Sequence, residues 1–419
     1  MKLTRRVSGV LIGVLLVWTA AASAADLKLI VFPLDGSSSR SLPAWLGEGI
    51  AVSLSEQLNT RGIKVLDRGE RTDLVESLDL PPGARLSHGS MIRVAQRASA
   101  DLLIMGTYRG TEPNLRISVR ALDVKTLKLS GEMSANGPMS ALPQMENELA
   151  WLILTNLGLG QSVSRDKFQE RTRKAPNSAY GYYIESLDSA SEDDQLHLLL
   201  KAVQAYRDFP EAQFRLGHLY FHKGDCGSAI PHLILGRSDD STRLESEFMR
   251  GTCFLQGDQP LEAIQAFSHV LQVSRPFQVL NNLGVAYLRK GDSALALNTL
   301  AEAKSLAHND STVSLNLAIA RHLQGNDSAS RSVVEEALKA HPQSGMLQYM
   351  LGFLLKAQGE NEKAAIATAK AKSLGVNVEK LQTEDPKTWS RLISSWEPSK
   401  LPTMACWMRA SILSKNHSA

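Results

Sequence analysis

The sequence has no segment beyond residue 26 that is apolar enough to cross a membrane, since crossing takes about 20 consecutive apolar residues. It also has little net charge, because 46 Lys and Arg residues oppose 43 Asp and Glu residues in a chain of 419. Without an excess of positive charge, the protein has no electrostatic reason to bind nucleic acid or an anionic membrane. The length is sufficient for two or three domains.

Catalytic and phosphate-binding motifs are also missing. We find no Ser nucleophile elbow, no phosphate-binding loop and no cluster of metal ligands. Gly47 and Gly49 come nearest to a phosphate loop, but Val52 stands where a third glycine is needed. His218 and His222 have a spacing that metals use on a helix, yet no third ligand accompanies them. We therefore expect no catalytic residues, no cofactors and no metal in a protein that is not an enzyme.

The first 24 residues have the three parts of a secretory signal peptide. These parts are a charged start at Lys2, Arg5 and Arg6, an apolar stretch over residues 10–18 and small residues at 22–24. Cleavage near Ala24 removes three positive charges, which lowers the formal net charge from +3 to 0. No cysteine follows the cleavage site, so we expect no lipid anchor there. The pattern predicts export to the periplasm, with association with the outer membrane left open.

Residues 25–159 alternate between short apolar runs and helical periodicity, which indicates a small α/β domain. We expect strands over residues 27–34, 63–66, 102–105, 115–121 and 127–135, and helices over 46–58, 90–100 and 142–157. This order predicts a mixed sheet covered by helices. Asp35, Asp67 and Arg68 lie near strand ends, where open α/β sheets bind ligands. Turn formation and a surface ion pair are the simpler interpretation of these three residues.

Three short motifs in this region resemble a known family. They are Phe32-Pro33 after the first strand, Gly47-Glu48-Gly49 at the start of the helix and Asp67-Arg68 after the second strand. On these motifs, residues 26–158 resemble the TolB amino-terminal-type domain, whose relatives include curli-secretion and flagellar outer-membrane accessory proteins. The resemblance implies an envelope assembly or interaction module without catalytic residues, and many bacterial proteins join such a domain to tetratricopeptide repeats.

Small residues recur at a nearly constant step in the second half of the chain. Gly217, Gly251, Gly284, Ala318 and Gly352 are separated by 34, 33, 34 and 34 positions. A period of 34, with small residues where two helices cross, is typical of a helix-turn-helix solenoid with a long concave surface. These segments resemble tetratricopeptide repeats, and glycines recur in the turns between their helices.

The third repeat is the clearest of the five. Its turn glycine is Gly291, which we expect to end the first helix, and Asp292 is expected to cap the second. Gly257 departs from the regular spacing, because it comes one residue early relative to the other turn glycines.

The patterns together predict an α+β protein, a mixed-sheet α/β domain followed by an all-α solenoid. The expected parts are a signal peptide at 1–24, the α/β domain at 25–159, a linker at 160–176, one degenerate and five clear repeats at 177–376 and a capping tail at 377–419. A solenoid needs its last apolar face covered, so we expect the Trp-containing tail to act as a cap. The alternative is that part of the tail lies in the groove near Tyr349 and Phe353 and must leave before a partner binds.

The first helix of each repeat is expected to line the groove. The candidate partner-binding residues, apolar at both ends and polar in the middle, are Phe214, His218, Phe248, Asn281, Asn282, Arg289, Asn316, His322, Tyr349 and Phe353. Asn282 and Asn316 have amides suited to bonding the extended backbone of a partner. The equally weighted alternative is that they bond only neighbouring helices or water.

Cysteine is scarce, and an odd number is unusual in an exported protein. Cys226 and Cys253 lie in adjacent repeats and could approach each other, which would leave Cys406 over. Spacing alone does not establish disulfide geometry, so we expect three small buried residues instead.

The sequence favours a non-enzymatic periplasmic scaffold that binds a protein or peptide in the solenoid groove and links it to an envelope complex. One alternative is an oligomeric accessory subunit of an outer-membrane assembly or secretion system, forming a homo-oligomer through the first domain. Another is a sensor that binds a small ligand at the strand ends of that domain.

Overall fold

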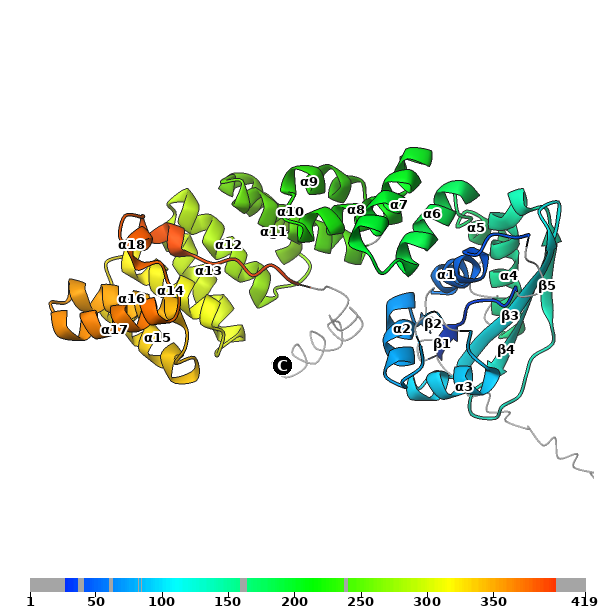
Figure 1. Cartoon of the computed structure of the whole chain (residues 1–419), viewed down its shortest axis with the longest axis horizontal. Helices are drawn as coiled ribbons and strands as arrows, with labels where there is room; N and C mark the ends of the chain where they lie inside the picture. The colour runs from blue at the N-terminus through cyan, green and yellow to red at the C-terminus, as the bar shows by residue number, and fades with distance from the viewer. Residues whose placement is uncertain are drawn as a thin grey trace, which may run out of the picture. The chain divides into compact units, whose positions relative to one another are not determined.

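The computed structural model describes residues 27–36, 41–59, 63–81, 83, 85–158, 164–236 and 240–396. The expected signal peptide, Cys406 and the last part of the tail lie outside these residues. The chain divides into two compact units, Met1–Ile184 and Glu185–Ala419. Figure 1 shows a sheet with helices in the first unit and successive helix pairs in the second.

The first unit contains a five-stranded sheet in the order β2-β1-β3-β4-β5. Its strands are β1 (Leu27–Val31), β2 (Ile63–Val65), β3 (Leu102–Thr111), β4 (Asn114–Asp123) and β5 (Met133–Gly137). β1 is parallel to both β2 and β3, whereas β4 is antiparallel to β3 and to β5. The sheet is therefore mixed, as the sequence predicts.

Two groups of helices cover this sheet. They are α1 (Leu46–Leu58) with α4 (Leu142–Asn156), and α2 (Arg68–Glu76) with α3 (His88–Arg97). Ile30 and Leu103 pack on Val75 and Val94 of the α2–α3 group. Leu29, next to Ile30 on β1, is also fully buried. Because neighbouring residues of a strand point to opposite faces, both faces of this central strand are covered.

Two predicted elements of the first unit need correction. Residues 68–76 form α2, a helix that the sequence analysis did not predict. Asp67 begins it through a capping box with Glu70, in which each side chain bonds the other residue's backbone N–H. The last strand is β5 at Met133–Gly137 and not residues 127–135, because Leu129 pairs with β4 only through an isolated bridge to Leu122 and the regular ladder begins at Met133.

The residues after α4 pack on the first unit. They form α5 (Arg165–Gln169) within the expected linker, and then α6 (Asn177–Asp188), which crosses the boundary between the units. Phe168 of α5 is fully buried, and its carbonyl accepts a bond from Asn147 of α4. Tyr180 of α6 packs edge-on against Trp45 at a centroid distance of 6.0 Å.

A buried carboxyl group lies beneath this region. Glu146 Oε2 accepts a hydrogen bond of 2.9 Å from Ser53 Oγ and lies 3.4 Å from Arg173 Nη2. Burial raises the pKa of Glu146 to about 7, although Arg173 and Ser53 act to lower it. The side chain of Arg173 also covers the ring of Tyr180, 3.9 Å from its centroid.

The second unit is a stack of antiparallel helix pairs. After α7 (Glu192–Ala205) the pairs are α8 (Pro210–His222) with α9 (Cys226–Leu235), α10 (Asp240–Gln256) with α11 (Pro260–Leu271), α12 (Phe277–Lys290) with α13 (Ser293–Leu306), α14 (Ser311–Leu323) with α15 (Asp327–Ala340) and α16 (Gly345–Ala357) with α17 (Asn361–Ser373). Each pair matches one of the five predicted repeats, so the solenoid is confirmed.

Close helix crossings explain why small residues recur about every 34 positions. A Cβ atom added to Gly284 would lie 2.4 Å from Leu300 Cγ on the second helix of its pair. The same addition at Gly251 would lie 2.6 Å from the ring of Phe267. These distances are shorter than a carbon–carbon contact allows, so the backbones approach only because these positions lack a side chain.

The turns inside the pairs share one backbone conformation. Gly224, Gly291, Gly325 and Gly359 have φ angles of 76°, 90°, 75° and 81°, each seven residues after the small residue of its repeat. In the second repeat this place falls on Asp258, with φ 55°, and not on Gly257. The early glycine therefore leaves a residue with a side chain in the left-handed region, which ordinarily favours glycine.

Cys226 and Cys253 form a disulfide bond, so the expectation that these two cysteines are unpaired was wrong. Cys226 is the first residue of α9, and Cys253 lies on α10 of the next pair. Stacking of these neighbouring pairs brings the two Cα atoms to 5.2 Å, within the range that a disulfide requires. Sequence spacing could not show this approach.

The residues after α17 have two roles. α18 (Val378–Leu381) covers the last pair, with Val378 and Leu381 packed in one cluster with Leu347 and Met350. A 3₁₀ turn, η4 (Pro386–Trp389), follows, and the chain then continues without helix or strand to residue 396. We call residues 389–396 the tail segment. Figure 1 shows it running along the helices of the solenoid, in red near α12.

Candidate functional site

The candidate site is the face of the first helices that holds the tail segment. We call its residues the inner surface: Phe248 of α10, Asn281 and Asn282 of α12, Asn316 of α14, and Tyr349 and Phe353 of α16. All six were predicted to line the groove, and the structure brings them together around one segment of chain. The asparagines lie in the middle of this surface and the aromatic residues at its ends.

The asparagines of the inner surface bond the tail backbone in pairs. Asn316 Nδ2 donates to the carbonyl of Arg391 at 2.8 Å, and Asn316 Oδ1 accepts from the N–H of Arg391 at 2.9 Å. Asn282 does the same with Ile393, at 2.8 Å and 2.9 Å. Each amide therefore satisfies both polar backbone groups of one tail residue.

Further hydrogen bonds fix the orientation of these amides. Asn281 Oδ1 accepts from Asn316 Nδ2 at 2.8 Å, and Asn281 Nδ2 donates to Asn282 Oδ1 at 3.1 Å. Asn282 Nδ2 lies 3.4 Å from Thr252 Oγ1. All three asparagines are 0% exposed. They thus bond neighbouring helices and an extended backbone at the same time. The sequence analysis had offered these two kinds of bonding as alternatives.

Aromatic residues anchor both ends of the tail segment. Trp389 makes edge contacts with Tyr349 and Phe353, at centroid distances of 5.1 Å and 5.0 Å. Trp396 makes an edge contact with Phe248 at 5.6 Å. The segment therefore runs from the fifth repeat to the second, opposite to the order of the repeats. Burial of two indole rings makes these ends the apolar part of the contact.

The other predicted groove residues contact their own or neighbouring helices. Arg289 donates to the carbonyl of Leu255, and burial lowers its pKa, with Arg391 lowering it further. His322 Nδ1 lies 2.6 Å from Asp327 Oδ1, and its ring contacts Phe353 edge-on.

Phe214 and His218 lie on α8, in the first pair. Their rings contact each other at 6.2 Å, and His218 Nε2 lies 3.2 Å from His222 Nε2. Across the part of the chain that the structure describes, no three His, Cys, Asp or Glu residues converge to hold a metal ion.

The repeat pattern of the sequence indicates the first helices as the groove lining but does not indicate which tail residues lie there. One signal was available, because Asn282 and Asn316 occupy the same position in consecutive repeats, as their separation of 34 shows. Arg391 and Ile393 could not be recognised from the sequence, because they are bound through their backbone N–H and C=O groups, which almost every residue has.

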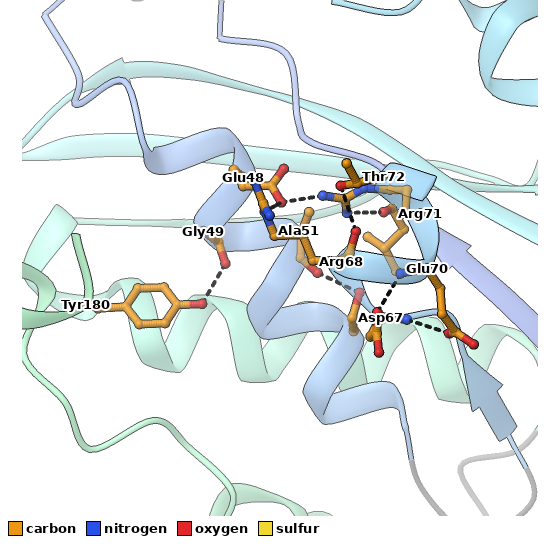
Figure 2. Close-up of polar contacts among 11 residues, drawn as sticks. Glu48, Gly49, Ala51, Asp67, Arg68, Glu70, Arg71, Thr72 and Tyr180 are labelled. Atoms are coloured by element: carbon orange, nitrogen blue, oxygen red, sulfur yellow. Dashed lines mark hydrogen bonds and ion pairs between the residues drawn. The ribbon is translucent and has the colours of Figure 1, made fainter. Parts of the chain in front are cut away.

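The strand ends of the first unit, the competing candidate site, are occupied by local contacts. Asp67 caps α2, and Arg68 Nε lies 3.1 Å from Glu48 Oε1 (Figure 2). Arg71 bonds the same carboxylate and also donates to the carbonyl of Val31 at 2.8 Å. Figure 2 shows the Glu48 carboxylate facing both arginines. These contacts favour the interpretation of the strand ends as turn chemistry and ion pairs.

The two glycines that suggested a phosphate loop have packing roles instead. Gly47 lies against the carbonyl of Leu34, where an added Cβ would come within 2.3 Å. The carbonyl of Gly49 accepts a hydrogen bond of 2.9 Å from the Tyr180 hydroxyl, which Figure 2 also shows. Both glycines lie within α1, so their amides are not arranged as a loop around an anion.

None of the helices built from described residues is long and apolar enough to cross a membrane. Residues 277–310, which form α12 and α13, match the family model of the tetratricopeptide repeat. Comparison with curated proteins finds no match.

Solved structures with similar folds include MamA, 18% identical, with a TM-score of 0.35 over 40% of this chain and 98% of its own. Another is YrrB, described as a TPR protein with an unusual peptide-binding site, 16% identical, with a TM-score of 0.36 over 44% of this chain and 98% of its own. The assignment of the second unit as a tetratricopeptide-type solenoid rests on its own helix pairs and on the matched repeat.

Proposed function

We propose that this protein is a non-enzymatic scaffold whose inner surface binds an extended segment of a protein partner. The observation that carries the proposal is the paired bonding of Asn282 and Asn316 to the backbone of alternate tail residues. An amide that bonds both the N–H and the C=O of one residue recognises extended chain whatever its side chains are. Extended peptides bind other proteins through such main-chain bonds, with pockets for selected side chains adding specificity.

Burial gives these polar contacts their importance. A buried amide without a partner costs free energy, whereas one that is bonded does not carry that penalty. The three asparagines are 0% exposed with the tail segment in place. The inner surface therefore needs an occupant that offers backbone donors and acceptors at this spacing, which a polypeptide supplies and an apolar ligand does not.

We further propose that the protein works in the periplasm, where the first unit links it to an envelope complex. The signal-peptide pattern of residues 1–24 and the TolB-type motifs of the first unit support this location. The disulfide between Cys226 and Cys253 supports it independently, because cytosolic thiols are generally kept reduced. Mass spectrometry of the exported protein tests it, since the mature chain should begin near Ala25.

The binding role is tested by opening the inner surface within the full chain. Trp389→Asp places a charge among Tyr349 and Phe353 and should release the tail segment. A fluorescent peptide with the sequence of residues 386–396 should then bind the variant, measured by fluorescence anisotropy. The exposed position Ser395 provides the matched control, because Ser395→Asp should leave the tail in place and the peptide unbound.

Asparagine variants show whether the peptide uses the proposed surface. Adding Asn282→Ala and Asn316→Ala to the opened chain should abolish peptide binding. If the opened chain binds no peptide while its circular dichroism stays native, or binds equally well without the asparagines, the proposed function is wrong.

A further inference from the structure

The tail segment shows what the inner surface accepts. Its two buried anchors, Trp389 and Trp396, are seven positions apart, with exposed fractions of 2% and 7%. Between them the surface bonds the backbone of Arg391 and Ile393. Leu392 and Ile393 are half-buried, whereas Arg391, Ser394 and Ser395 are exposed. Burial therefore restricts which side chains fit at the two ends and at the centre of the segment, whereas the exposed positions accept any side chain.

Building on the proposed function, we propose that the tail segment is a resident competitor of the partner. The partner carries an extended segment with two aromatic residues separated by six others and aliphatic residues near the centre. Binding requires exchange, because the tail segment and the partner use the same asparagine amides and the same aromatic contacts. The unbound protein is therefore closed by its own chain.

One imperfect contact distinguishes the tail from the partner that displaces it. Trp389 is almost fully buried, yet no described residue accepts a hydrogen bond from its indole Nε1. A buried donor without a partner weakens binding, because it gives up its bond with water and gains none. Phenylalanine fills an aromatic contact without carrying this donor. The partner's first anchor is therefore phenylalanine, at the place that Trp389 occupies in the tail.

This difference explains how a partner in solution can compete with an attached segment. A tethered ligand acts at an effective concentration on the order of millimolar, so a partner with the same contacts would bind poorly. Removal of the unpaired donor gives the partner an advantage of about tenfold, which corresponds to 1.4 kcal/mol. A partner with the better anchor therefore matches the tail at about a tenth of that effective concentration, on the order of 0.1 mM, and binds above it.

The test uses the full chain with a protease site inserted between Glu384 and Asp385, after the cap and before the tail segment. The protein folds with its tail in place, the site is cut, and the released fragment is exchanged by dialysis. Peptides with the sequence of residues 386–396 are then titrated by anisotropy. The peptide with Trp389→Phe should bind about tenfold more tightly than the unchanged peptide.

Further peptides test the second anchor and the tolerant positions. Trp396→Ala should weaken binding at least 30-fold, and Ser395→Ala, at an exposed position, should leave it unchanged. If the phenylalanine peptide binds no better than the unchanged one, the inference about the first anchor is wrong while the proposed function stands. If no peptide binds the cut protein, the proposed function itself is wrong.

A measurement on the uncut chain gives an independent check that does not depend on cutting. Trp389→Phe in the intact protein should slow hydrogen exchange of the Arg391 and Ile393 amides by about tenfold, because the closed state gains the same advantage. Unchanged or faster exchange at these amides would overturn the inference.

Discussion

The amide of Asn282 bonds both backbone polar groups of Ile393, a residue 111 positions further along the chain. Asn316 bonds Arg391 in the same way, so two consecutive repeats hold alternate residues of one extended segment. The relationship makes the solenoid a holder of extended chain, with its own tail as the occupant in this structure.

Loss of one asparagine should loosen the tail segment. Asn316→Ala removes two hydrogen bonds to Arg391 and one to Asn281. This should destabilise the closed tail by about 2 kcal/mol, which raises the population of the open tail roughly 30-fold. Hydrogen exchange at the Arg391 amide measures the change. Asn298, exposed on α13, is the control, and Asn298→Ala should have no effect. Equal exchange in the two variants would contradict the assigned role of Asn316.

The disulfide should contribute substantially to the stability of the first two helix pairs. Cys226 and Cys253 enclose a loop with a sequence separation of 27 residues, for which chain entropy predicts a contribution of about 3.5 kcal/mol. Replacing both by serine should lower the free energy of unfolding by that amount, measured by urea titration. A reducing agent should destabilise the natural chain similarly and leave the double variant unaffected. Insensitivity of the natural chain to reduction would argue against the bond.

A methyl group at the third helix crossing should disturb the pair. Gly284→Ala puts a Cβ where Leu300 already lies, so we expect a net loss of about 1–2 kcal/mol despite the better helix propensity of alanine. Thermal unfolding measures the loss. The double variant with Leu300→Ala should show a favourable coupling, because the smaller side chain makes room. Strict additivity of the two losses would show that the crossing is not tight.

The strained turn of the second repeat should be improvable. Asp258 has φ 55°, whereas its counterparts in the other four repeats are glycines, which adopt a positive φ at lower cost. Asp258→Gly should raise the free energy of unfolding by about 0.5–1 kcal/mol, and Asp258→Ala should lower it. Asp258→Asn serves as the charge control, because asparagine tolerates this conformation and should change stability little. A glycine variant no more stable than the alanine variant would refute the argument.

Glu146 should make the first unit less stable as pH rises. Its pKa is raised from 4.5 to about 7 in the folded protein, so the folded state holds a proton that the unfolded state has released between these values. Stability is therefore highest below pH 4.5, falls by about 3 kcal/mol between pH 4.5 and 7, and levels off above pH 7. Hydrogen exchange of the α4 amides reports this loss. Glu146→Gln has no titrating proton, so stability should no longer change with pH over this range. If the pH dependence persists in this variant, another group is its cause.

Much of the fold follows from local patterns in the sequence. The ladder from Gly217 to Gly352 fixes the helix pairs, since only small residues allow two helices to approach this closely. Alternation of Leu115, Ile117 and Val119 gives β4 one buried face. The short helix α2 was missed, because Arg68–Glu76 is mainly polar and is held by its capping box and by Val75. The last strand was misplaced because its pairing with β4 is interrupted between the isolated bridge at Leu129 and the start of β5 at Met133.

The sequence by itself determined the repeats, the residues of the inner surface and the aromatic content of the tail, because each depends on residue type at a fixed spacing. Only the tertiary structure decided that Cys226 pairs with Cys253 and that Asn282 and Asn316 hold the tail backbone. These contacts join residues far apart in the chain, and their backbone partners carry no sequence signature. Their existence depends on how successive helix pairs stack, which sets distances that spacing along the chain does not contain.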